Sequence, residues 1–512
     1  MKRVWKWTKS VLAVSISASV VLAGCSSGGN KENSPAQGSS SASSGAAETG
    51  LKPYALTFVF PTTADAKDMG LVEEAVNKIT KEKINATVKF VPISFGAWAQ
   101  QTTLMLSGNE KVDVIFSGIG TYNQQASKGQ LLPMEDLIER YGQEAKAALD
   151  DQSPQILEAA RIDGHIYGMP DIKDLAENYG FTIRKDLVDK YGIDLSAVKT
   201  IDDLDPVFQK LKDNEATMFP TYKYSLSIID TISNGYMDNL GDGFGVLPNF
   251  DNNLKVVDWY ETPEYAKLLD TVRRWYLAGF IPKDIATSTE TGTQVMKAGK
   301  TASYLSHMKP GFAEQESRNS GQTLESIELL PAAATTGKIT RFLLSIANNS
   351  DNPDRAMMFI NLLYTDKELS NLLAWGIEGK HYVKQADGTI NYPAGVDATN
   401  TGYGLFTGYL FGNQFLQYVW SGNDPQLWTT MSDFNKAARK SKALGFSFNA
   451  EPVKTELAAV TNVTNQFKVS LETGTIDPKK NLPEFIKQLK AAGIDKIVAE
   501  KQKQLDAWAA QQ

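Results

Sequence analysis

Cysteine and histidine are the scarcest reactive residues of this chain. Among 512 residues there are one cysteine, Cys25, and three histidines, His165, His307 and His381. A single cysteine excludes an internal disulfide and a thiolate metal site, and its place near the start leaves the body without a cysteine nucleophile. Three histidines are few for histidine-based catalysis or for a histidine metal cluster. Stability therefore has to come from packing.

The motifs of common enzyme classes are also missing. No GxSxG elbow, HExxH zinc motif or P-loop occurs. The acidic pairs Glu73-Glu74 and Asp202-Asp203 do not form a catalytic carboxylate pair, because neighbouring residues on a helix or strand point apart. The sequence predicts that the protein is not an enzyme. A secreted glycosidase stays an alternative, since its site would use the same aromatic and acidic residues.

The charge is moderately negative, and no long apolar run follows the first 25 residues. The formal net charge is −7, and it becomes −11 once residues 1–24, with four positive and no negative charges, are removed. A net negative charge does not favour binding to nucleic acid. With 42% apolar and 10% aromatic residues, the chain beyond residue 52 is long enough for two or three globular domains.

The first 25 residues have the layout of a secretion signal. A positive region comes first and contains four basic residues: Lys2, Arg3, Lys6 and Lys9. The apolar core at 11–21 is too short to cross a bilayer, which takes about 20 apolar residues. Leu22 to Cys25 resembles a bacterial lipobox, in which the cysteine thiol is diacylglycerated before the chain is cut. This predicts lipidation at Cys25 after removal of a signal peptide at 1–24; an ordinary signal with a chance cysteine is the alternative.

Residues 26–52 are rich in Ser, Gly and Ala, with one aliphatic residue, Leu51. Such a stretch cannot form a core and is typical of a flexible tether, with an r.m.s. reach of roughly 30 Å. Lipid, tether and body together predict a protein held on the outer face of the cell membrane, in the extracellular space.

Hydrophobic periodicity predicts alternating strands and helices after residue 53. Apolar runs at 55–60, 86–91 and 112–116 read as strands, with helical patterns between them. Parallel strands with crossover helices predict an α/β sheet, in which ligands bind outside the carboxyl ends of the strands. The segments at those ends are 61–67, 92–98 and 117–122.

Further along, the pattern predicts a strand at 181–184, a turn at 297–302 followed by a strand at 303–305, and a helix that starts at Asn352-Pro353. Residues 494–508 show helical spacing of apolar residues. We expect this helix to pack on the body; a partner-binding helix is the alternative.

In their order, several of these segments resemble a known family. They are the lipobox, the tether, the Gly299–Ala302 turn, IANNSDNPDRAMMFINLLYTDKEL (346–369), WGIEGKHYV (375–383), FGNQF (411–415), ALGFSF (443–448) and AAGIDKIVAEKQKQLDAW (491–508). Together they resemble carbohydrate-type extracellular solute-binding proteins of bacterial ABC importers, in a large Gram-positive subgroup with an extended C-terminal region. The resemblance implies two α/β lobes with a hinge and an interlobe cleft, a sugar ligand, most simply an oligosaccharide, and ABC transporter permease subunits as partners of a monomer.

Laid onto this chain, the resemblance implies a lobe order with crossovers near Ile166–Leu175, near Ser326–Leu330 and after Leu372. The expected segments are lobe one at 53–171 and 326–372, lobe two at 172–325, a lobe-two or cleft segment at 373–450, and a C-terminal helical region at 451–512.

Five residues of lobe one are candidates for the sugar site, because sugars need aromatic faces and hydrogen-bonding groups. Trp98, Ser117 and Tyr122 lie at the predicted carboxyl edge of the sheet, while Tyr167 and Asp171 flank the proposed hinge. For Trp98 the alternative is a core position, and for Tyr122 it is a ring that caps the sheet.

Lobe two and the C-terminal half supply the other candidates, which stand in loops rich in functional side chains. They are His307, Lys309, Trp375, Glu378, Tyr382, Asn413 and Gln414. Lys309 has a solvated loop charge as its alternative, and Asn413 and Gln414 have backbone capping or turn formation.

No cofactor is expected, with calcium as the one metal to consider. Asp238 to Gly243 has the first, fifth and sixth features of an EF-hand loop, but Leu240 stands at the third position and Asn249 at the twelfth. A Gly-rich turn explains this loop better. A surface sensor that presents ligand to a membrane kinase, or a receptor for peptides or lipids, stays open as an alternative function.

Overall fold

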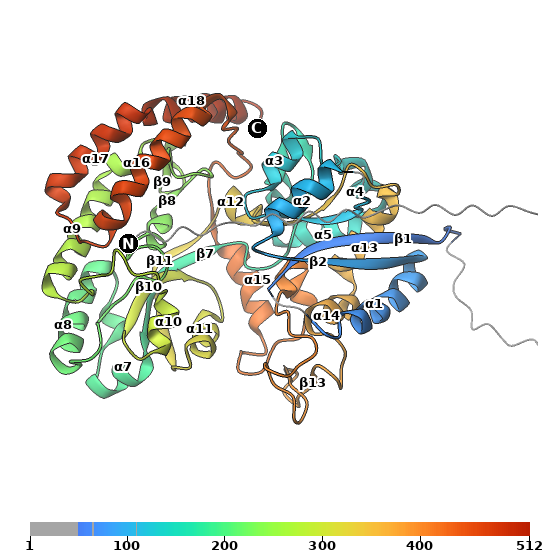
Figure 1. Cartoon of the computed structure of the whole chain (residues 1–512), viewed down its shortest axis with the longest axis horizontal. Coiled ribbons are helices and arrows are strands. Elements are labelled where there is room, and N and C mark those ends of the chain that lie inside the picture. Colours follow the sequence, from blue (N-terminus) through green and yellow to red (C-terminus); the bar gives the residue numbers. More distant parts are fainter. Residues whose placement is uncertain (1–49, 64–65, 109) are drawn as a thin grey trace, which may run out of the picture. The chain divides into compact units, whose positions relative to one another are not determined.

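The computed structural model describes residues 50–512 except 64, 65 and 109. Two β-sheets each carry a separate hydrophobic core, and we call these halves the first and the second lobe (Figure 1). The predicted signal peptide, Cys25 and most of the tether lie outside the described residues. No helix in the described part of the chain is long and apolar enough to span a membrane.

A five-stranded sheet with the order β2-β1-β3-β12-β6 forms the first lobe. Its strands are β1 (Tyr54–Thr62), β2 (Ala86–Ser94), β3 (Val114–Gly118), β6 (Met169–Pro170) and β12 (Phe342–Ile346). β1 pairs in parallel with β2 and β3, which confirms the predicted β-α-β-α-β order. β12 and β6 extend the sheet antiparallel.

Helices cover this sheet. They are α1 (Met69–Ile84), α2 (Trp98–Ser107), α3 (Tyr122–Ser127), α4 (Glu135–Tyr141), α5 (Gln143–Gln152), α6 (Gln155–Glu158), α13 (Pro353–Thr365) and α14 (Lys367–Trp375). The predicted start of α13 is confirmed: Pro353 is its first residue, and the Asn352 side chain accepts a hydrogen bond from the N–H of Arg355 at 3.1 Å. That bond satisfies a backbone donor that has no partner inside the helix.

The second lobe has a four-stranded sheet with the order β10-β7-β11-β15. Its strands are β7 (Glu177–Arg184), β10 (Ser303–Met308), β11 (Leu324–Ala334) and β15 (Arg439–Lys440). β10 and β11 flank β7 antiparallel, and only β15 is parallel to its neighbour. The predicted strands at 181–184 and 303–305 are therefore confirmed as parts of longer strands.

The helices of the second lobe include a C-terminal group that Figure 1 shows in red beside α9. They are α7 (Lys185–Tyr191), α8 (Asp205–Asn214), α9 (Pro263–Ala278), α10 (Gly292–Lys297), α11 (Phe312–Ser320), α16 (Lys454–Glu472), α17 (Pro478–Ala492) and α18 (Ile494–Ala509). Phe485, Leu489 and Ile497 belong to the same buried core as the sheet. The expectation that the last helix packs on the body is confirmed.

Short two-stranded ribbons complete the secondary structure. They are β4 (Arg161–Ile162) with β5 (His165–Ile166), β8 (Met237–Asp238) with β9 (Leu247–Pro248), and β13 (Val383–Lys384) with β14 (Ile390–Asn391).

Three crossovers join the lobes. The first is 171–176, the second is 335–341 with α12 (Thr336–Ile339), and the third is 412–438 with α15 (Leu427–Ala437). Ala176, Ala334 and Ala438 form a small buried cluster where the crossovers reach the second sheet. Their short side chains allow three backbones to come together.

The structure places two boundaries away from their expected positions. Residues 326–330 lie within β11 of the second sheet, so the chain returns to the first lobe only at 335–341. Within 373–450, Tyr403, Leu405 and Phe411 belong to the core of the first lobe. The ring centroid of Phe411 lies 5.3 Å from that of Phe60 on β1. Local patterns do not reveal which of two sheets an irregular segment will cover.

The start of the described chain is held by a buried arginine. Arg355 of α13 is 4% exposed, and its Nη1 donates to the carbonyls of Lys52, Ile84 and Asn85 at 3.2, 2.6 and 2.9 Å. The side chain of Asn85 in turn donates to the carbonyl of Leu51 at 2.7 Å. The guanidinium thus ties the residues before β1 to the end of α1.

Candidate functional site

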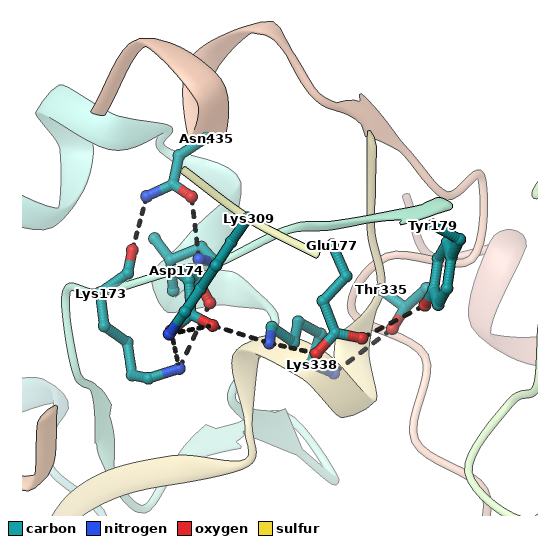
Figure 2. A network of polar contacts seen from close by, with 9 residues as sticks. Lys173, Asp174, Glu177, Tyr179, Lys309, Thr335, Lys338 and Asn435 are labelled. Carbon is teal, nitrogen blue, oxygen red and sulfur yellow. Dashed lines mark hydrogen bonds and ion pairs between the residues drawn. The ribbon is translucent and has the colours of Figure 1, made fainter. Parts of the chain in front are cut away.

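A network of buried charges joins the first and second crossovers to the second lobe (Figure 2). At its centre the carboxylate of Asp174, in the first crossover, is paired with three lysines. Lys309 Nζ and Lys338 Nζ lie 3.4 and 3.2 Å from its Oδ2, and Lys173 contacts its Oδ1. Lys309 follows β10, and Lys338 lies on α12. The pairs therefore connect three separate segments.

The charges of this network stabilise one another. Burial by itself would raise the pKa of the Asp174 carboxyl, but the neighbouring ammonium groups outweigh burial and hold that pKa well below its usual range. At Glu177 burial is again opposed by a positive charge, that of Lys338, and the result is a pKa of about 2. Desolvation lowers the pKa of Lys173 to about 8. Removal of either carboxylate would leave buried ammonium groups uncompensated.

The third crossover joins this network through Asn435 of α15. Its Nδ2 donates to the carbonyl of Lys173 at 2.6 Å, and its Oδ1 accepts from the N–H of Leu175 at 2.9 Å (Figure 2). All three crossovers therefore meet at one polar point. A change in the angle between the lobes therefore has to change the contacts of these polar groups.

Asp171 marks a second junction between crossovers. It is 1% exposed, and its Oδ1 accepts from the N–H of Gly412 at 2.9 Å, while its buried Oδ2 has no hydrogen-bond partner among the described residues. Burial raises the pKa of this carboxyl well above its usual range. The backbones run side by side here, because the N–H of Ile172 donates to the carbonyl of Gly412 at 2.8 Å.

Four partly exposed rings form what we call the aromatic cluster: Trp375, Tyr392, Phe406 and Trp420. The Trp420 ring centroid lies 5.3 Å from that of Trp375, 4.7 Å from that of Tyr392 and 5.7 Å from that of Phe406. Phe406 is 46% exposed. The Nε1 of Trp375 is buried without an acceptor among the residues described. The cluster thus combines an accessible ring with an unused hydrogen-bond donor.

Phe406 also has an unusual backbone. Its φ is +50°, in the left-handed region that bulky side chains rarely adopt. Ile119, directly after β3, has φ +48° and is 44% exposed. Strained residues that present large apolar side chains to solvent are typical of ligand-binding segments. Ile119 lies in one of the segments that the sequence places at the carboxyl ends of the strands.

The aromatic cluster lies close to the second lobe. The carbonyl of Trp420 accepts a hydrogen bond from Nδ2 of Asn423 at 2.8 Å, and Oδ1 of Asn423 accepts from Nη1 of Arg318 on α11 at 3.1 Å. The loop between β10 and α11 holds Lys309 of the charge network. The rings of the aromatic cluster, which include Trp420 of the third crossover, and polar groups of the second lobe are therefore neighbours.

Comparison with known proteins assigns this architecture to a family. A family described as bacterial extracellular solute-binding protein matches residues 63–369. The chain belongs to this family. Residues 442–510, which include the three C-terminal helices of this solute-binding protein, match a domain of unknown function, DUF3502.

Relatives of known type cover nearly the whole chain. A carbohydrate ABC transporter substrate-binding protein of Streptococcus pneumoniae serotype 4 is 30% identical over 474 residues, which are 90% of this chain and 92% of that protein. The crystal structure of an N-glycan transport solute binding protein, NgtS, from Streptococcus pneumoniae has a TM-score of 0.79 at 26% identity and covers 89% of this chain and 99% of that one. NgtS in complex with Man5GlcNAc gives a TM-score of 0.67. The two-lobed α/β fold with extra C-terminal helices is therefore confirmed.

Three predicted site residues of this solute-binding protein are buried in the first lobe. Trp98 is 3% exposed and packs on Phe116, with ring centroids 5.7 Å apart. Ser117 donates from its hydroxyl to Oε1 of Gln125 at 3.2 Å. The hydroxyl of Tyr122 donates to the carbonyl of Ala160 at 2.5 Å. For Trp98 the structure matches the core position that the sequence left open.

Tyr167 and the two residues after β10 are more accessible. Tyr167 is half-buried beside the first core, and its N–H donates to the Tyr122 hydroxyl at 3.1 Å. His307 is half-buried, with its ring centroid 5.5 Å from that of Tyr224. Lys309 is partly exposed and pairs with Asp174, so its charge is not a solvated loop charge.

The C-terminal candidates differ among themselves. Trp375 lies in the aromatic cluster, whereas Glu378 is exposed and pairs with Lys384 at 2.8 Å, and Tyr382 is 5% exposed. Asn413 caps its own turn, because its Oδ1 accepts from the N–H of Phe415 at 3.0 Å. Gln414 is half-buried, and its backbone N–H donates to the carbonyl of Ile172 at 2.9 Å.

Several residues of the site escape sequence reasoning. They are Glu177, Lys338, Asn435, Ile119, Phe406 and Trp420. The first three lie in segments without a motif, and only the fold brings them together. Trp420 and Phe406 carry a weak signal, since both are aromatic residues within a Gly-rich segment without regular periodicity.

Proposed function

We propose that this protein captures an oligosaccharide between its two lobes and delivers it to the permease of an ABC transporter. The observation that carries the proposal is the aromatic cluster of Trp375, Tyr392, Phe406 and Trp420, which lies next to α11 of the second lobe. Exposed rings stack on the C–H faces of sugars, and the polar groups around them bind hydroxyls. A carbohydrate substrate-binding protein as a relative supports the same ligand class.

The polar side of the site would come from the edge of the second sheet that meets the crossovers. Asn178, at the start of β7, donates through Nδ2 to Oε2 of Glu328 at 2.5 Å, and its buried Oδ1 has no partner within the described chain. His307 and Lys309 stand at the end of the neighbouring strand β10. These groups offer donors and acceptors to sugar hydroxyls, while the first lobe offers rings.

Capture would proceed by hinge closure. A ligand that contacts both lobes stabilises the closed form only through contacts that the open form lacks. The three crossovers meet at the Asp174 network and at Asp171, so these buried polar groups would act as the pivot. For a micromolar sugar the total binding free energy is about −8 kcal/mol, which a few stacked rings and several hydrogen bonds supply.

We further propose that the protein is a lipoprotein of the outer face of the cell membrane and acts as a monomer without enzymatic activity. Residues 1–25 have the signal and lipobox pattern, and lipid on Cys25 would hold the body near the permease. The family and the relatives are binding proteins, which supports a role in binding.

Thermal stability with a panel of sugars tests the proposal. The full-length protein is purified in a detergent without a sugar headgroup, and melting is measured with N-glycan fragments such as Man5GlcNAc, with fructo-oligosaccharides and with plant oligosaccharides. A saturable rise in Tm with intact sugar supports a sugar receptor. Mass spectrometry of the same wells detects hydrolysis. Cleaved sugar would show that the protein is an enzyme. If no member of the panel changed Tm, the proposal of a carbohydrate ligand would be wrong.

A further inference from the structure

One loop of the second lobe encloses the end of a lysine from the C-terminal helices. The loop runs from Asp238, the last residue of β8, to Gly245. Lys501 lies on α18, and its side chain is 0% exposed. Its Nζ donates to Oδ1 of Asp242 at 2.5 Å and to the carbonyl of Gly245 at 3.1 Å. An ammonium group so far from water needs partners that are fixed in place.

The loop is shaped around this ammonium. Its two carboxylates, from Asp238 and Asp242, each have a buried Oδ2 without a hydrogen-bond partner in the described part of the chain. Gly245 has φ +138°, and a Cβ at this position would lie 3.4 Å from Cδ of Lys501. The loop thus brings two carboxyl groups together and leaves room for the lysine stem at Gly245. The Phe448 ring lies 4.8 Å from Nζ and completes the enclosure.

The other lysines near Lys501 on α18 do not behave in this way. The side chain of Lys496 is 72% exposed and that of Lys503 is 76% exposed, and both pair with glutamates at 3.1 and 3.2 Å. Such surface pairs contribute little to stability. Of the three lysines of α18, only Lys501 has a buried charge.

We propose that the loop Asp238–Gly245 is a cation site whose cation is the ammonium of Lys501, supplied by the domain of unknown function. The ion pair between Lys501 and Asp242 thus holds the C-terminal domain on the second lobe. The Asp242 carboxylate pairs with the ammonium, and the Gly245 carbonyl fixes its position. A free primary ammonium ion is then the ligand that the loop accepts once the lysine is shortened.

Chemical rescue tests this assignment in the full-length protein. Lys501→Ala removes the ammonium and its stem, and Lys503→Ala is the matched control on the same helix. We expect Lys501→Ala to lower Tm by roughly 5 °C or more, since the packed lysine stem is lost and the partly buried Asp242 carboxylate loses its partner. Methylammonium chloride should restore part of that loss. Tetramethylammonium chloride at the same concentration should not, because it has no N–H donors and is too large.

Two results would overturn the proposal. One is a Tm of Lys501→Ala equal to that of Lys503→Ala, and the other is a response to methylammonium no larger than the response to tetramethylammonium. If Lys501→Ala does not fold, Lys501→Met is compared with the double variant Lys501→Met/Asp242→Asn. The double variant should melt at the higher temperature, since it removes the uncompensated charge. Equal or lower melting of the double variant would contradict the cation site.

Discussion

Asp171 accepts a hydrogen bond from the backbone N–H of Gly412 at 2.9 Å, across 241 positions of the sequence. Asp171 begins the first crossover and Gly412 begins the third, so one carboxyl oxygen ties two connections between the lobes. Gly412 has φ +73°, and a Cβ there would lie 2.6 Å from the carbonyl oxygen of Leu363. This close approach requires glycine.

We expect Asp171→Asn to become more stable, relative to the wild type, as pH rises. Burial raises the pKa of this carboxyl far above the value of about 3.9 in an unfolded chain. A raised folded pKa contributes stability that is complete below about pH 4 and is lost as pH rises through the folded pKa. The amide keeps the acceptor for Gly412 and never ionises. Thermal melting of both proteins between pH 4 and pH 8 measures the difference.

Asp171→Ala serves as the control for that experiment. It removes the acceptor of the Gly412 N–H and, since neither side chain ionises, it should be about 1–3 kcal/mol less stable than Asp171→Asn at every pH. A Tm difference between Asp171→Asn and wild type that stays constant over this range would show that the carboxyl does not titrate as described.

Trp420→Ala should weaken oligosaccharide binding by roughly tenfold, the equivalent of about 1.4 kcal/mol. The reason is the loss of the central ring of the aromatic cluster, which touches the three others. Isothermal titration with the sugar found in the thermal panel gives the affinity. Phe219→Ala removes a ring of the second lobe that is 40% exposed and lies outside the cluster, so it should bind normally. Equal affinities for the two variants would show that the aromatic cluster is not part of the binding site.

Glu177→Gln should destabilise the protein near neutral pH and have no effect in strong acid. Lys338 outweighs the burial of Glu177 and lowers its pKa from 4.5 to about 2, a shift that amounts to about 3 kcal/mol. This stability is present above about pH 4.5 and is lost as pH falls toward 2. Unfolding by urea between pH 3 and pH 7 measures the loss.

A second glutamate makes the Glu177 experiment specific. Glu325 on β11 has a side chain that is 42% exposed and pairs with Lys185 only at 3.7 Å. Glu325→Gln should therefore follow the wild type at every pH. If Glu177→Gln also followed the wild type, the Lys338 pair would contribute nothing to the hinge.

Cys25→Ser should move the protein from the membrane fraction to the culture medium without a change in Tm of the body. A serine cannot receive the diacylglycerol thioether, and two acyl chains are what make such anchoring stable. Fractionation followed by immunoblotting detects the change, and mass spectrometry of the wild-type N-terminus detects the lipid. Continued retention of Cys25→Ser in membranes would contradict lipid anchoring.

Much of the first lobe is predictable from local sequence. The strands expected at 55–60 and 86–91 are the middle of β1 and the start of β2, because buried parallel strands read as continuous apolar runs. Asn352 before Pro353 predicts the start of α13 from capping chemistry alone. The antiparallel order of the second sheet is not predictable in this way, since pairing between β7 and β11 joins residues far apart in the sequence.

The site is less predictable than the fold, for a physical reason. Trp98 stands at the carboxyl edge of the first sheet as expected, yet it is the first residue of α2 and its ring packs on Phe116 in the core. Lys338 and Asn435 have no motif and gain their roles only from contact with residues 161 and 262 positions away. The resemblance to a family implies a ligand between the lobes, but it does not say which side chains would contact that ligand.

The buried guanidinium of Arg355 lies where a force applied to the N-terminal end of the described chain would first act. Any pull on the chain before residue 52 reaches three carbonyls held by one side chain of α13, and then β1, which is paired on both sides by parallel neighbours. Force along a strand in the middle of a sheet acts on all its hydrogen bonds at once and does not open them one by one. A force applied at this end would therefore act on β1, and the rings of the aromatic cluster, which lie in a distant part of the sequence, would keep their places.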